Sequence, residues 1–274
     1  MKFNQAPLPF VGQKRNFLKN FCHVLNDNIP DTGKGWTIID VFGGSGLLAH
    51  HAKMTKPDAR VIYNDFDHYM ERLNNIEDIN RLRRILLTTI GDIPFRKRLD
   101  NKTKDLVLNE IKNFKGYIDI ASLQTWLLFS GRQINSLDQL FNKSLWNRIR
   151  KTDYPNATGY LNNVEIISKS FDLLLPDFVN HNKTLLILDP PYLFTDQTNY
   201  LRNSSYFGQV EFRKLMALIS PPFIYFSSDK TRIKDCFNFL IEQNDERFIN
   251  YECINIKAPI SHNMTYQDNM IFKF

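Results

Sequence analysis

Cysteines are scarce in this sequence, and long apolar runs are absent. The 274 residues include three cysteines, Cys22, Cys236 and Cys253, an odd number at wide spacing. They form neither a disulfide framework nor a metal-ligand pattern, so we expect a reducing compartment and no metal site. No stretch approaches the roughly 20 apolar residues that cross a bilayer. Pro7 and Pro9, with early charges, make the start unlike a signal peptide. These absences predict a cytoplasmic protein.

The remaining composition is typical of a folded α/β protein. Hydrophobic residues make up 43% of the chain and aromatic residues 13%, too much for a disordered segment. Short apolar runs alternate with longer mixed segments over 37–68 and 164–274, which indicates a parallel sheet with crossover helices. Helices are expected at 11–28 and 209–220. Seven strands are expected, near 37–41, 60–64, 164–167, 184–188, 222–226, 251–256 and 268–273.

Residues 69–160 differ from the rest in pattern and in charge. Their apolar spacing predicts a mostly helical insertion. Residues 72–151 hold 16 Lys and Arg against 8 Asp and Glu, a net +8, whereas the whole chain carries +6. This excess is compatible with an ordinary solvated surface, and it is also typical of a protein that binds nucleic-acid phosphates. The expected helices are 69–90, 102–115, 119–130 and 136–149, with breaks at Pro94, Gly116 and Gly131.

The most informative motif is Asp189-Pro190-Pro191-Tyr192, which directly follows the apolar run 185–188. That run predicts a buried strand, so the motif lies where the strand leaves the core. Two prolines remove two backbone donors and stiffen the turn. The turn then presents a carboxylate, a free carbonyl at Pro190 and an aromatic face, the groups needed to hold an exocyclic amino group and its ring. Taken alone, a strand-to-loop turn with a capping Asp fits equally well.

A second candidate site lies upstream, where strand 37–41 leads into Phe42-Gly43-Gly44-Ser45-Gly46. Glycines at such a turn permit positive φ angles and close approach of a ligand. The next strand ends in Asn64-Asp65, about 20 residues beyond the glycines, where a nucleoside ribose is usually bound. These features predict an adenosine-type cofactor site, with a purely structural glycine turn and acidic turn as the alternative. The adjacent His50 and His51 have no ligand partners nearby and are expected as a partly buried helical pair.

Three motifs in this order resemble those of the amino-methyltransferases that use S-adenosylmethionine: Asp40–Gly46, Asn64-Asp65 and Asp189–Tyr192. More narrowly, the chain resembles the Dam-like, D12 class DNA adenine-N6 methyltransferases. The motifs lie near both ends of the chain and in the segments predicted to form the sheet, and they leave the predicted helical insertion unmatched. The further matching segments are the opening Pro9–Arg15, then Ser168-Lys169-Ser170-Phe171, Phe223–Asp229 and Asp268–Phe274.

The resemblance implies a Rossmann-like, mostly parallel seven-stranded methyltransferase sheet with an inserted helical target-recognition domain. Residues 1–68 and 161–274 would form the catalytic domain and 69–160 the DNA-recognition domain. S-adenosylmethionine would be the cofactor and S-adenosylhomocysteine the product, with Lys14 on the methionyl carboxylate and Asp65 on the ribose. The implied cofactor-binding residues are Phe10, Gly12, Lys14, Asp40, Phe42, Gly43, Gly44, Gly46, Asp65, Ser170, Phe171 and Asp189. The implied catalytic residues are Asp189, Pro190, Pro191 and Tyr192.

The implied reaction is site-specific methylation of the N6 amino group of an adenine that is flipped out of double-stranded DNA. Asp189 and the Pro190 carbonyl would accept the amino hydrogens, and Tyr192 would stack on the base. The expected setting is a bacterial or phage-infected cell, with the enzyme on nucleoid DNA as a monomer or weak dimer, and with restriction–modification as one context.

Two groups of side chains in the insertion are candidates for DNA contact. The loop 130–135 places Arg132, Gln133 and Asn135 together, and these residue types suit guanine and adenine edges. A polar interhelical loop is the alternative for this segment. Arg148, Arg150 and Lys151 are expected to contact phosphates, which position the duplex without reading its sequence.

Two positions depart from the family pattern, and other functions are alternatives to DNA adenine methylation. Gln13 replaces a glycine common beside the opening lysine, and Lys169 stands where an acidic residue is often found. An RNA adenine or DNA cytosine-N4 methyltransferase would use the same acceptors, but Asp at position 189 favours adenine, whereas Ser is commoner in cytosine enzymes and Asn in protein-glutamine enzymes. A nicotinamide oxidoreductase has no use for the Asp189 motif, and a DNA-binding module without catalysis would not need it intact.

Overall fold

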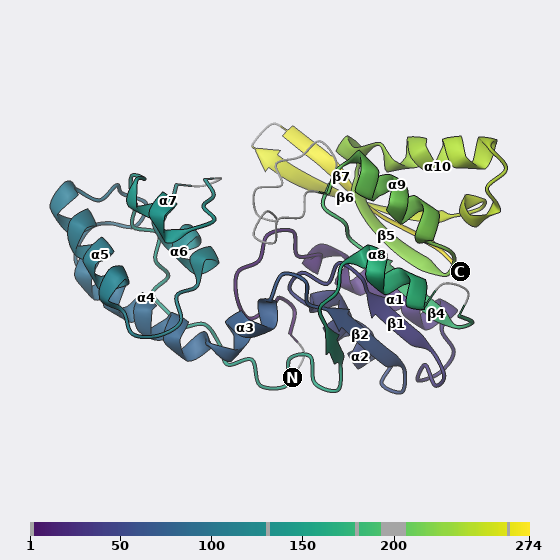
Figure 1. Cartoon of the computed structure of the whole chain (residues 1–274), viewed down its shortest axis with the longest axis horizontal. Coiled ribbons are helices and arrows are strands. Elements are labelled where there is room, and N and C mark those ends of the chain that lie inside the picture. The colour runs from purple at the N-terminus through teal and green to yellow at the C-terminus, as the bar shows by residue number, and fades with distance from the viewer. Residues whose placement is uncertain (1–2, 130–131, 179–180, 193–206, 262–263) are drawn as a thin grey trace.

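A computed structural model describes residues 3–129, 132–178, 181–192, 207–261 and 264–274. Within them the chain forms one seven-stranded sheet in the order β3-β2-β1-β4-β5-β7-β6 (Figure 1). Neighbouring strands pair in parallel except β7, which is antiparallel to β5 and β6. This is the expected Rossmann-like methyltransferase fold. The strands are β1 (Thr37–Asp40), β2 (Arg60–Asn64), β3 (Glu165–Ile167), β4 (Thr184–Leu188), β5 (Phe223–Ser228), β6 (Glu252–Ser261) and β7 (Met264–Lys273).

Helices cover both faces of the sheet because successive strand residues point to opposite sides. Ile38 of β1 belongs to the core beneath α1 (Leu18–Asn28) and α2 (Leu47–Thr55), together with Phe21 and Leu48. Its neighbour Ile39 belongs to the opposite core, beneath the helices that follow β3, β4 and β5. Those helices are α8 (Phe171–Leu174), α9 (Gln209–Leu218) and α10 (Ile233–Glu242).

The neighbouring strands β1 and β4 bring the two sequence motifs to the same edge of the sheet. Their register pairs Asp40 with Ile187, and the Val41 amide donates to the Ile187 carbonyl at 3.0 Å. The glycine turn begins just after Asp40, and Asp189 lies two residues after Ile187. Since β2 lies on the other side of β1, this edge is the topological switch point where α/β proteins bind ligands.

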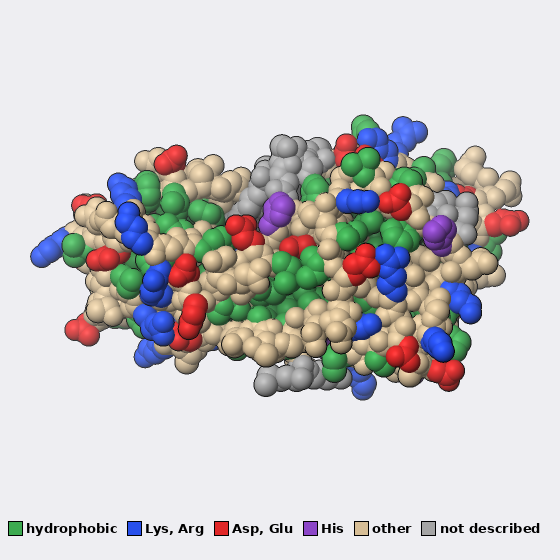
Figure 2. Space-filling model, turned by 60° about the horizontal axis from the view of Figure 1, so that its bottom comes forward, with side chains coloured by type: hydrophobic (Ala, Val, Ile, Leu, Met, Phe, Trp, Pro, Cys, Tyr) green, Lys and Arg blue, Asp and Glu red, His purple; other side chains and the backbone are tan. Residues whose placement is uncertain are grey.

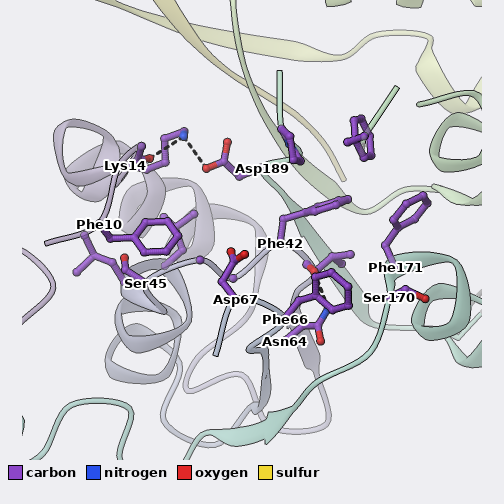
Figure 3. Close-up of a pocket in the computed structure, with 18 of the residues that line it drawn as sticks. Phe10, Lys14, Phe42, Ser45, Asn64, Phe66, Asp67, Ser170, Phe171 and Asp189 are labelled. Carbon is purple, nitrogen blue, oxygen red and sulfur yellow. Dashed lines mark hydrogen bonds and ion pairs between the residues drawn. The ribbon is translucent and has the colours of Figure 1, made fainter. Parts of the chain in front are cut away.

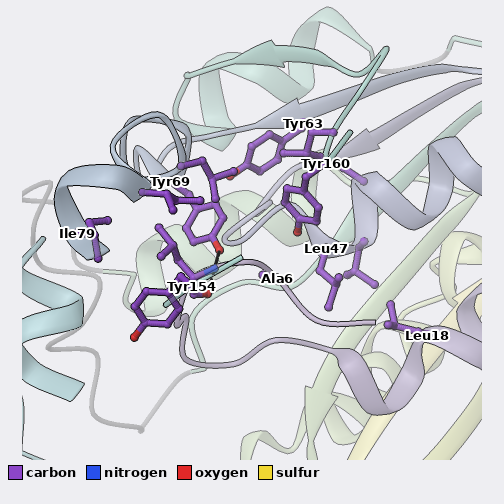
Figure 4. Close-up of a cluster of buried hydrophobic side chains, with 14 of the residues drawn as sticks. Ala6, Leu18, Leu47, Tyr63, Tyr69, Ile79, Tyr154 and Tyr160 are labelled. Atoms are coloured by element: carbon purple, nitrogen blue, oxygen red, sulfur yellow. Dashed lines mark hydrogen bonds between the residues drawn. The ribbon is translucent and has the colours of Figure 1, made fainter. Parts of the chain in front are cut away.

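Residues 69–141 form a group of helices at one side of the sheet (Figure 1). Asp100, Asp119 and Ser136 each cap a helix by accepting a hydrogen bond from a backbone amide three residues later. We call this group of helices the helical lobe, and the sheet with its covering helices the sheet lobe. The hydrophobic core is continuous between the two lobes, since the buried Tyr69 and Tyr160 lie in the same cluster as Ile79 of the helical lobe and Leu47 of the sheet lobe (Figure 4). The helices are α3 (Tyr69–Asn74), α4 (Ile76–Ile90), α5 (Asn101–Asn113), α6 (Ile120–Leu127) and α7 (Leu137–Phe141).

The expected helix over 136–149 is wrong beyond Phe141. The chain there is extended, and Trp146 forms an antiparallel bridge with Arg98. The Trp146 amide also donates to the Leu127 carbonyl at 2.8 Å. Backbone pairing between segments distant in sequence therefore replaced the local helix that apolar spacing predicted. The other expected helices are present with shifted ends, and the one expected at 69–90 is divided at Asn75.

Candidate functional site

A cavity of about 590 Å³ opens at the carboxyl edge of β1, β2 and β4 (Figure 3). Its size is that of a typical small-molecule site. Six segments contribute to its wall: the opening segment, the glycine turn, the end of β2, the start of α8, the Asp189 motif, and Phe207 with the first turns of α9. The predicted residues that line it are Phe10, Gly12, Lys14, Phe42, Gly43, Gly44, Ser170, Phe171, Asp189 and Pro191.

The glycine turn has a conformation that larger residues would not adopt here. Gly44 and Gly46 have φ angles of 50° and 73°, in the left-handed region. A Cβ on Gly43 would lie 2.3 Å from ring carbons of Tyr63. The Tyr63 hydroxyl donates to the Gly44 carbonyl at 2.7 Å, and the Tyr160 hydroxyl donates to the Ser45 carbonyl at 2.8 Å. Two buried tyrosines therefore fix the turn from below. Gly46 begins α2 and does not line the cavity.

The opening segment is held over the glycine turn by α3. The Tyr69 hydroxyl bonds both the amide and the carbonyl of Leu8, each at 2.9 Å. Phe10 packs edge-on against Tyr69, with ring centroids 5.7 Å apart. The same Phe10 ring covers Gly44, where an added Cβ would lie 2.8 Å from it. This packing places Lys14, a few residues further on, at the cavity wall.

Lys14 and Asp189 meet in the cavity although 175 positions separate them in sequence. The Lys14 ammonium lies 2.5 Å from Asp189 Oδ2 and also donates to the Gly12 carbonyl at 2.9 Å (Figure 3). Both side chains are largely buried, at 11% and 19% exposure. Burial raises the pKa of the Asp189 carboxyl, and the Lys14 ammonium opposes that rise. The ammonium therefore favours the ionised form of Asp189, the form that accepts hydrogen bonds.

Asp40 is a second buried carboxyl at the same edge, below the cavity wall. Its Oδ2 accepts from the Ala49 amide at 3.2 Å, while its Oδ1 has no hydrogen-bond partner within the described residues. Burial, and then the nearby Asp189 carboxylate, raises the pKa of Asp40 to about 7. An unsatisfied buried carboxylate oxygen is unfavourable unless a donor approaches it. The site therefore suits a ligand that brings a positively charged group.

The acidic side chain at the end of β2 that lines the cavity is Asp67, which corrects the placement expected for Asp65. Both Asp65 oxygens are used by α3, with the Tyr69 amide on Oδ1 at 2.6 Å and the Met70 amide on Oδ2 at 2.9 Å. The Tyr63 hydroxyl also lies 2.8 Å from Asp65 Oδ1, so its one proton is shared between this oxygen and the Gly44 carbonyl. Asp67, two residues on, lies at the cavity wall beside Phe66. Asp65 and Asp67 lie two positions apart in the same loop. The start of α3 binds Asp65, whereas Asp67 lies at the cavity wall.

Aromatic rings line the far end of the cavity. Phe42 lies 5.6 Å from Phe171 and 5.8 Å from Phe207, measured between ring centroids. Ser170 donates to Asp172 at 2.6 Å, and Asn64 ties the turn before α8 to β1 by donating to the carbonyls of Val41 and Lys169. Sequence reasoning missed Phe66, Asp67, Phe207, Tyr63 and Tyr160 as site residues. They lie outside the motifs, and only the fold brings Phe66, Asp67 and Phe207 to the cavity and the two tyrosines beneath the glycine turn.

Pro190 and Tyr192 lie in a smaller pocket that shares Pro191 with the main cavity. This second pocket holds about 10 Å³ and is lined by apolar and aromatic side chains, among them Tyr225. The volume is far below that of a nucleobase, so stacking by Tyr192 stays a prediction. The Lys14 ammonium lies 5.6 Å from the centroid of the Tyr192 ring, which places this ring next to the Asp189 ion pair.

The residues expected to contact DNA are partly used within the protein. One Arg148 guanidinium nitrogen donates to the Leu128 carbonyl, and Arg150 lies over the Tyr154 ring at 4.3 Å. Arg132 and Lys151 are exposed, whereas Gln133 and Asn135 are half-buried. Ser130 and Gly131 of the same loop lie outside the described residues. DNA contact by these side chains therefore stays a prediction.

Neither a metal-ligand cluster nor a membrane-spanning helix is found among the described residues. In the part of the chain that the structure describes, no three His, Cys, Asp or Glu side chains are grouped as metal ligands would be. His50 and His51 are buried on α2, and burial lowers the pKa of His50 to about 4. Every described helix is too short or too polar to span a bilayer.

Comparison with known proteins gives three findings. The family model described as D12 class N6 adenine-specific DNA methyltransferase matches residues 10–219. A Haemophilus influenzae protein provisionally named a methyltransferase is 51% identical over 276 aligned positions, covering 99% of this chain and 93% of the relative. A crystal structure of a Pyrococcus horikoshii protein, provisionally named an RNA methyltransferase, is 10% identical with a TM-score of 0.38, covering 96% of this chain and 86% of that one.

Proposed function

Because the chain belongs to the D12 class of N6 adenine-specific DNA methyltransferases, we propose that it transfers a methyl group from S-adenosylmethionine to adenine N6 in double-stranded DNA. One observation carries the proposal. Asp189, at the tip of β4, lies in the same cavity as the glycine turn at the tip of β1 and is paired with Lys14. A donor bound at the turn and an amino group held by Asp189 would then be neighbours, as methyl transfer requires.

The residues present fit S-adenosylmethionine, which when bound supplies an electrophilic methyl group on a positively charged sulfur. The carboxylate of Asp40 can balance the methionyl ammonium, since one of its oxygens has no other donor in the described residues. Lys14 can share its charge between Asp189 and the methionyl carboxylate. Asp67 suits the ribose hydroxyls. The rings of Phe42, Phe66, Phe171 and Phe207 offer stacking surface for the adenine of the cofactor.

Asp189 would act on the substrate amino group. This nitrogen is a poor nucleophile because its lone pair is delocalised into the purine ring. An ionised carboxylate that accepts one of its hydrogens favours the geometry in which the lone pair is available, and the Pro190 carbonyl can accept the other. Lys14 supports this role because its ammonium opposes the effect of burial on the Asp189 pKa and so favours the ionised form.

The target adenine would reach Asp189 only after flipping out of the duplex, at a cost of a few kcal/mol. We assign residues 69–160 to DNA recognition in this proposal, because this segment carries the basic excess and forms a lobe beside the catalytic cavity. The remaining residues, 1–68 and 161–274, would form the catalytic domain. A cytoplasmic location on cellular or phage DNA follows from such a substrate.

The proposal is tested by replacing Asp189. Asp189→Ala and Asp189→Asn are expected to lower the rate of labelled methyl transfer to DNA by about 10²- to 10⁴-fold, because a positioned acceptor for the amino hydrogen is lost. The matched control is Asp177→Asn, which removes a surface carboxylate whose ion pair in the described part of the chain is with Lys169. The control should keep the wild-type rate. A near wild-type rate for Asp189→Ala would contradict the proposal.

A further inference from the structure

An exposed, basic and partly aromatic turn lies in the helical lobe between α4 and α5. Phe95 is 56% exposed, and Arg96, Lys97 and Arg98 after it are all exposed. None of them belongs to the residues that sequence reasoning assigned to DNA. Residues 96–99 pair with residues 145–147, and we call these two paired segments the arginine ribbon.

The backbone pairing decides which side chains share a face of the ribbon. The Leu99 amide donates to the Leu145 carbonyl at 2.9 Å, and the Asn147 amide donates to the Lys97 carbonyl at 2.8 Å. Arg98 and Trp146 are therefore a non-hydrogen-bonded antiparallel pair, whose side chains lie closest together on one face. Leu99 and Leu145 are buried on the other face. Arg98 and Trp146 are thus directed away from the core.

Aromatic rings accompany the arginines on this surface. Phe129 is 53% exposed and packs against Trp146, with ring centroids 5.1 Å apart. The Arg96 guanidinium lies 5.5 Å from the centroid of the Phe95 ring. Large exposed rings beside guanidinium groups are unusual on a surface that serves only solubility. Arginine with aromatic neighbours is the combination that proteins use on nucleic acids.

Within the described residues, the arginines of the ribbon differ from three arginines of α4 in lacking acidic partners. Arg81 pairs with Asp78, while Arg83 and Arg84 both pair with Asp153. Within the described residues, Arg96 and Arg98 form no ion pair and no side-chain hydrogen bond. Arg96 also has a φ of 67°, in the left-handed region that residues other than glycine seldom adopt.

We propose that the arginine ribbon binds the phosphate backbone of duplex DNA, with Arg96 and Arg98 as the contacting groups. The proposal rests on DNA being the substrate, as proposed above. Residues 72–151 carry a net charge of +8, and Figure 2 shows Lys and Arg side chains on the helical lobe, so a duplex would meet a lobe of net positive charge. Phosphate contacts hold the duplex in place and carry no sequence information. The ribbon would therefore serve affinity and leave sequence choice to other residues.

The test compares Arg96→Gln/Arg98→Gln with a control that loses the same charge elsewhere. The control is Lys19→Gln/Lys34→Gln, two exposed lysines of the sheet lobe without ion pairs in the described residues. Binding to a substrate duplex and to a random duplex is measured at several salt concentrations with S-adenosylhomocysteine present. On both duplexes the slope of log K against log salt should fall by about 2 for the ribbon variant, which is about 1 for each phosphate that is no longer neutralised. The control should keep the wild-type slope.

Two additional variants keep the test decisive. Arg96→Lys/Arg98→Lys retains both charges and should retain the slope, since an ammonium also binds phosphate. If the double Gln variant loses its fold, judged by thermal unfolding and S-adenosylhomocysteine binding, Arg98→Gln alone should lower the slope by about 1.

The outcomes separate this inference from the proposed function. Equal slopes for the ribbon variant and the control would overturn the ribbon's role while leaving methyl transfer intact. Wild-type protein that binds neither duplex would instead reject DNA as the substrate. Tighter binding to double-stranded RNA that depends on Arg96 and Arg98 would overturn the choice of DNA.

Discussion

At the scale of single residues, the site depends on two buried carboxyl groups that share one ammonium. Asp40 and Asp189 lie at the tips of neighbouring strands, and Lys14 reaches Asp189 from the opening segment. With both carboxyls ionised the group carries one net negative charge, which is unfavourable in a buried place. A cationic cofactor would relieve it. The same arrangement explains why the pKa of Asp40 rises to about 7 while Lys14 opposes the rise for Asp189.

The raised pKa of Asp40 predicts a pH-dependent stability that Asp40→Asn removes. Since the pKa rises from 3.8 to about 7 on folding, the native protein keeps a proton that the unfolded chain releases between these values. The stabilising effect of that proton is complete below pH 3.8 and is lost as pH rises through 7. In thermal unfolding without cofactor, Asp40→Asn should therefore gain stability relative to wild type as pH rises from 5.5 to about 7.5.

Cofactor affinity should show the opposite trend. The methionyl ammonium needs the ionised carboxylate, so calorimetric affinity of wild type for S-adenosylmethionine should increase between about pH 6 and pH 7.5. Asp40→Asn should bind more weakly and without this increase. A stability difference between the two proteins that is constant across pH would show that Asp40 does not titrate in this range.

At the scale of elements, α3 connects the helical lobe to the cavity. Arg72 of α3 forms a bidentate pair with Asp119, the cap of α6, with both N–O distances at 2.9 Å. The Arg72 Nη2 that bonds Asp119 also donates its second hydrogen to the Pro9 carbonyl, next to the cavity residue Phe10. Both partners of the pair are almost fully buried, with exposures of 6% and 2%. The pair therefore fixes the opening segment and α6 to the same helix.

Loss of this pair should be far more costly than loss of a similar exposed pair. Arg72→Met leaves Asp119 buried without its partner and should lower the free energy of unfolding by about 3–5 kcal/mol. The control is Arg60→Met, since Arg60 forms an equally short bidentate pair with Glu165 at the exposed edge of the sheet. That change should cost about 0–1 kcal/mol. Urea unfolding measures both, and equal losses would refute the structural role given to Arg72.

Elements set by local sequence were predictable, whereas elements that depend on contacts with distant residues were not. The strands β1 and β4 were predictable because each is a short apolar run that leads into a recognisable motif. Residues 145–148 were not, because their extended form depends on residues 96–99 and 127, far away in sequence. Asp67 was missed for a related reason. The loop after β2 contains two acidic residues, Asp65 and Asp67. Only the amides at the start of α3 determine that Asp65 points to the helix.

At the scale of the whole molecule, two lobes share one continuous core and carry different charge. The sheet lobe contains the cavity, and the helical lobe contains the excess of Lys and Arg. A continuous core makes a fixed relation between the lobes more favourable than a freely hinged one. A duplex bound to the helical lobe would then meet the Asp189 edge of the sheet in a defined position, which suits site-specific modification.

The most direct test is the chemical identity of the methylated base. Wild-type protein is incubated with S-adenosylmethionine and mixed duplex DNA, the DNA is digested to nucleosides, and the products are separated by mass spectrometry. Asp189→Ala serves as the blank. The account predicts N6-methyladenine in the wild-type reaction and none above background in the blank. N4-methylcytosine as the sole product, or methylation of RNA with none in DNA, would contradict it.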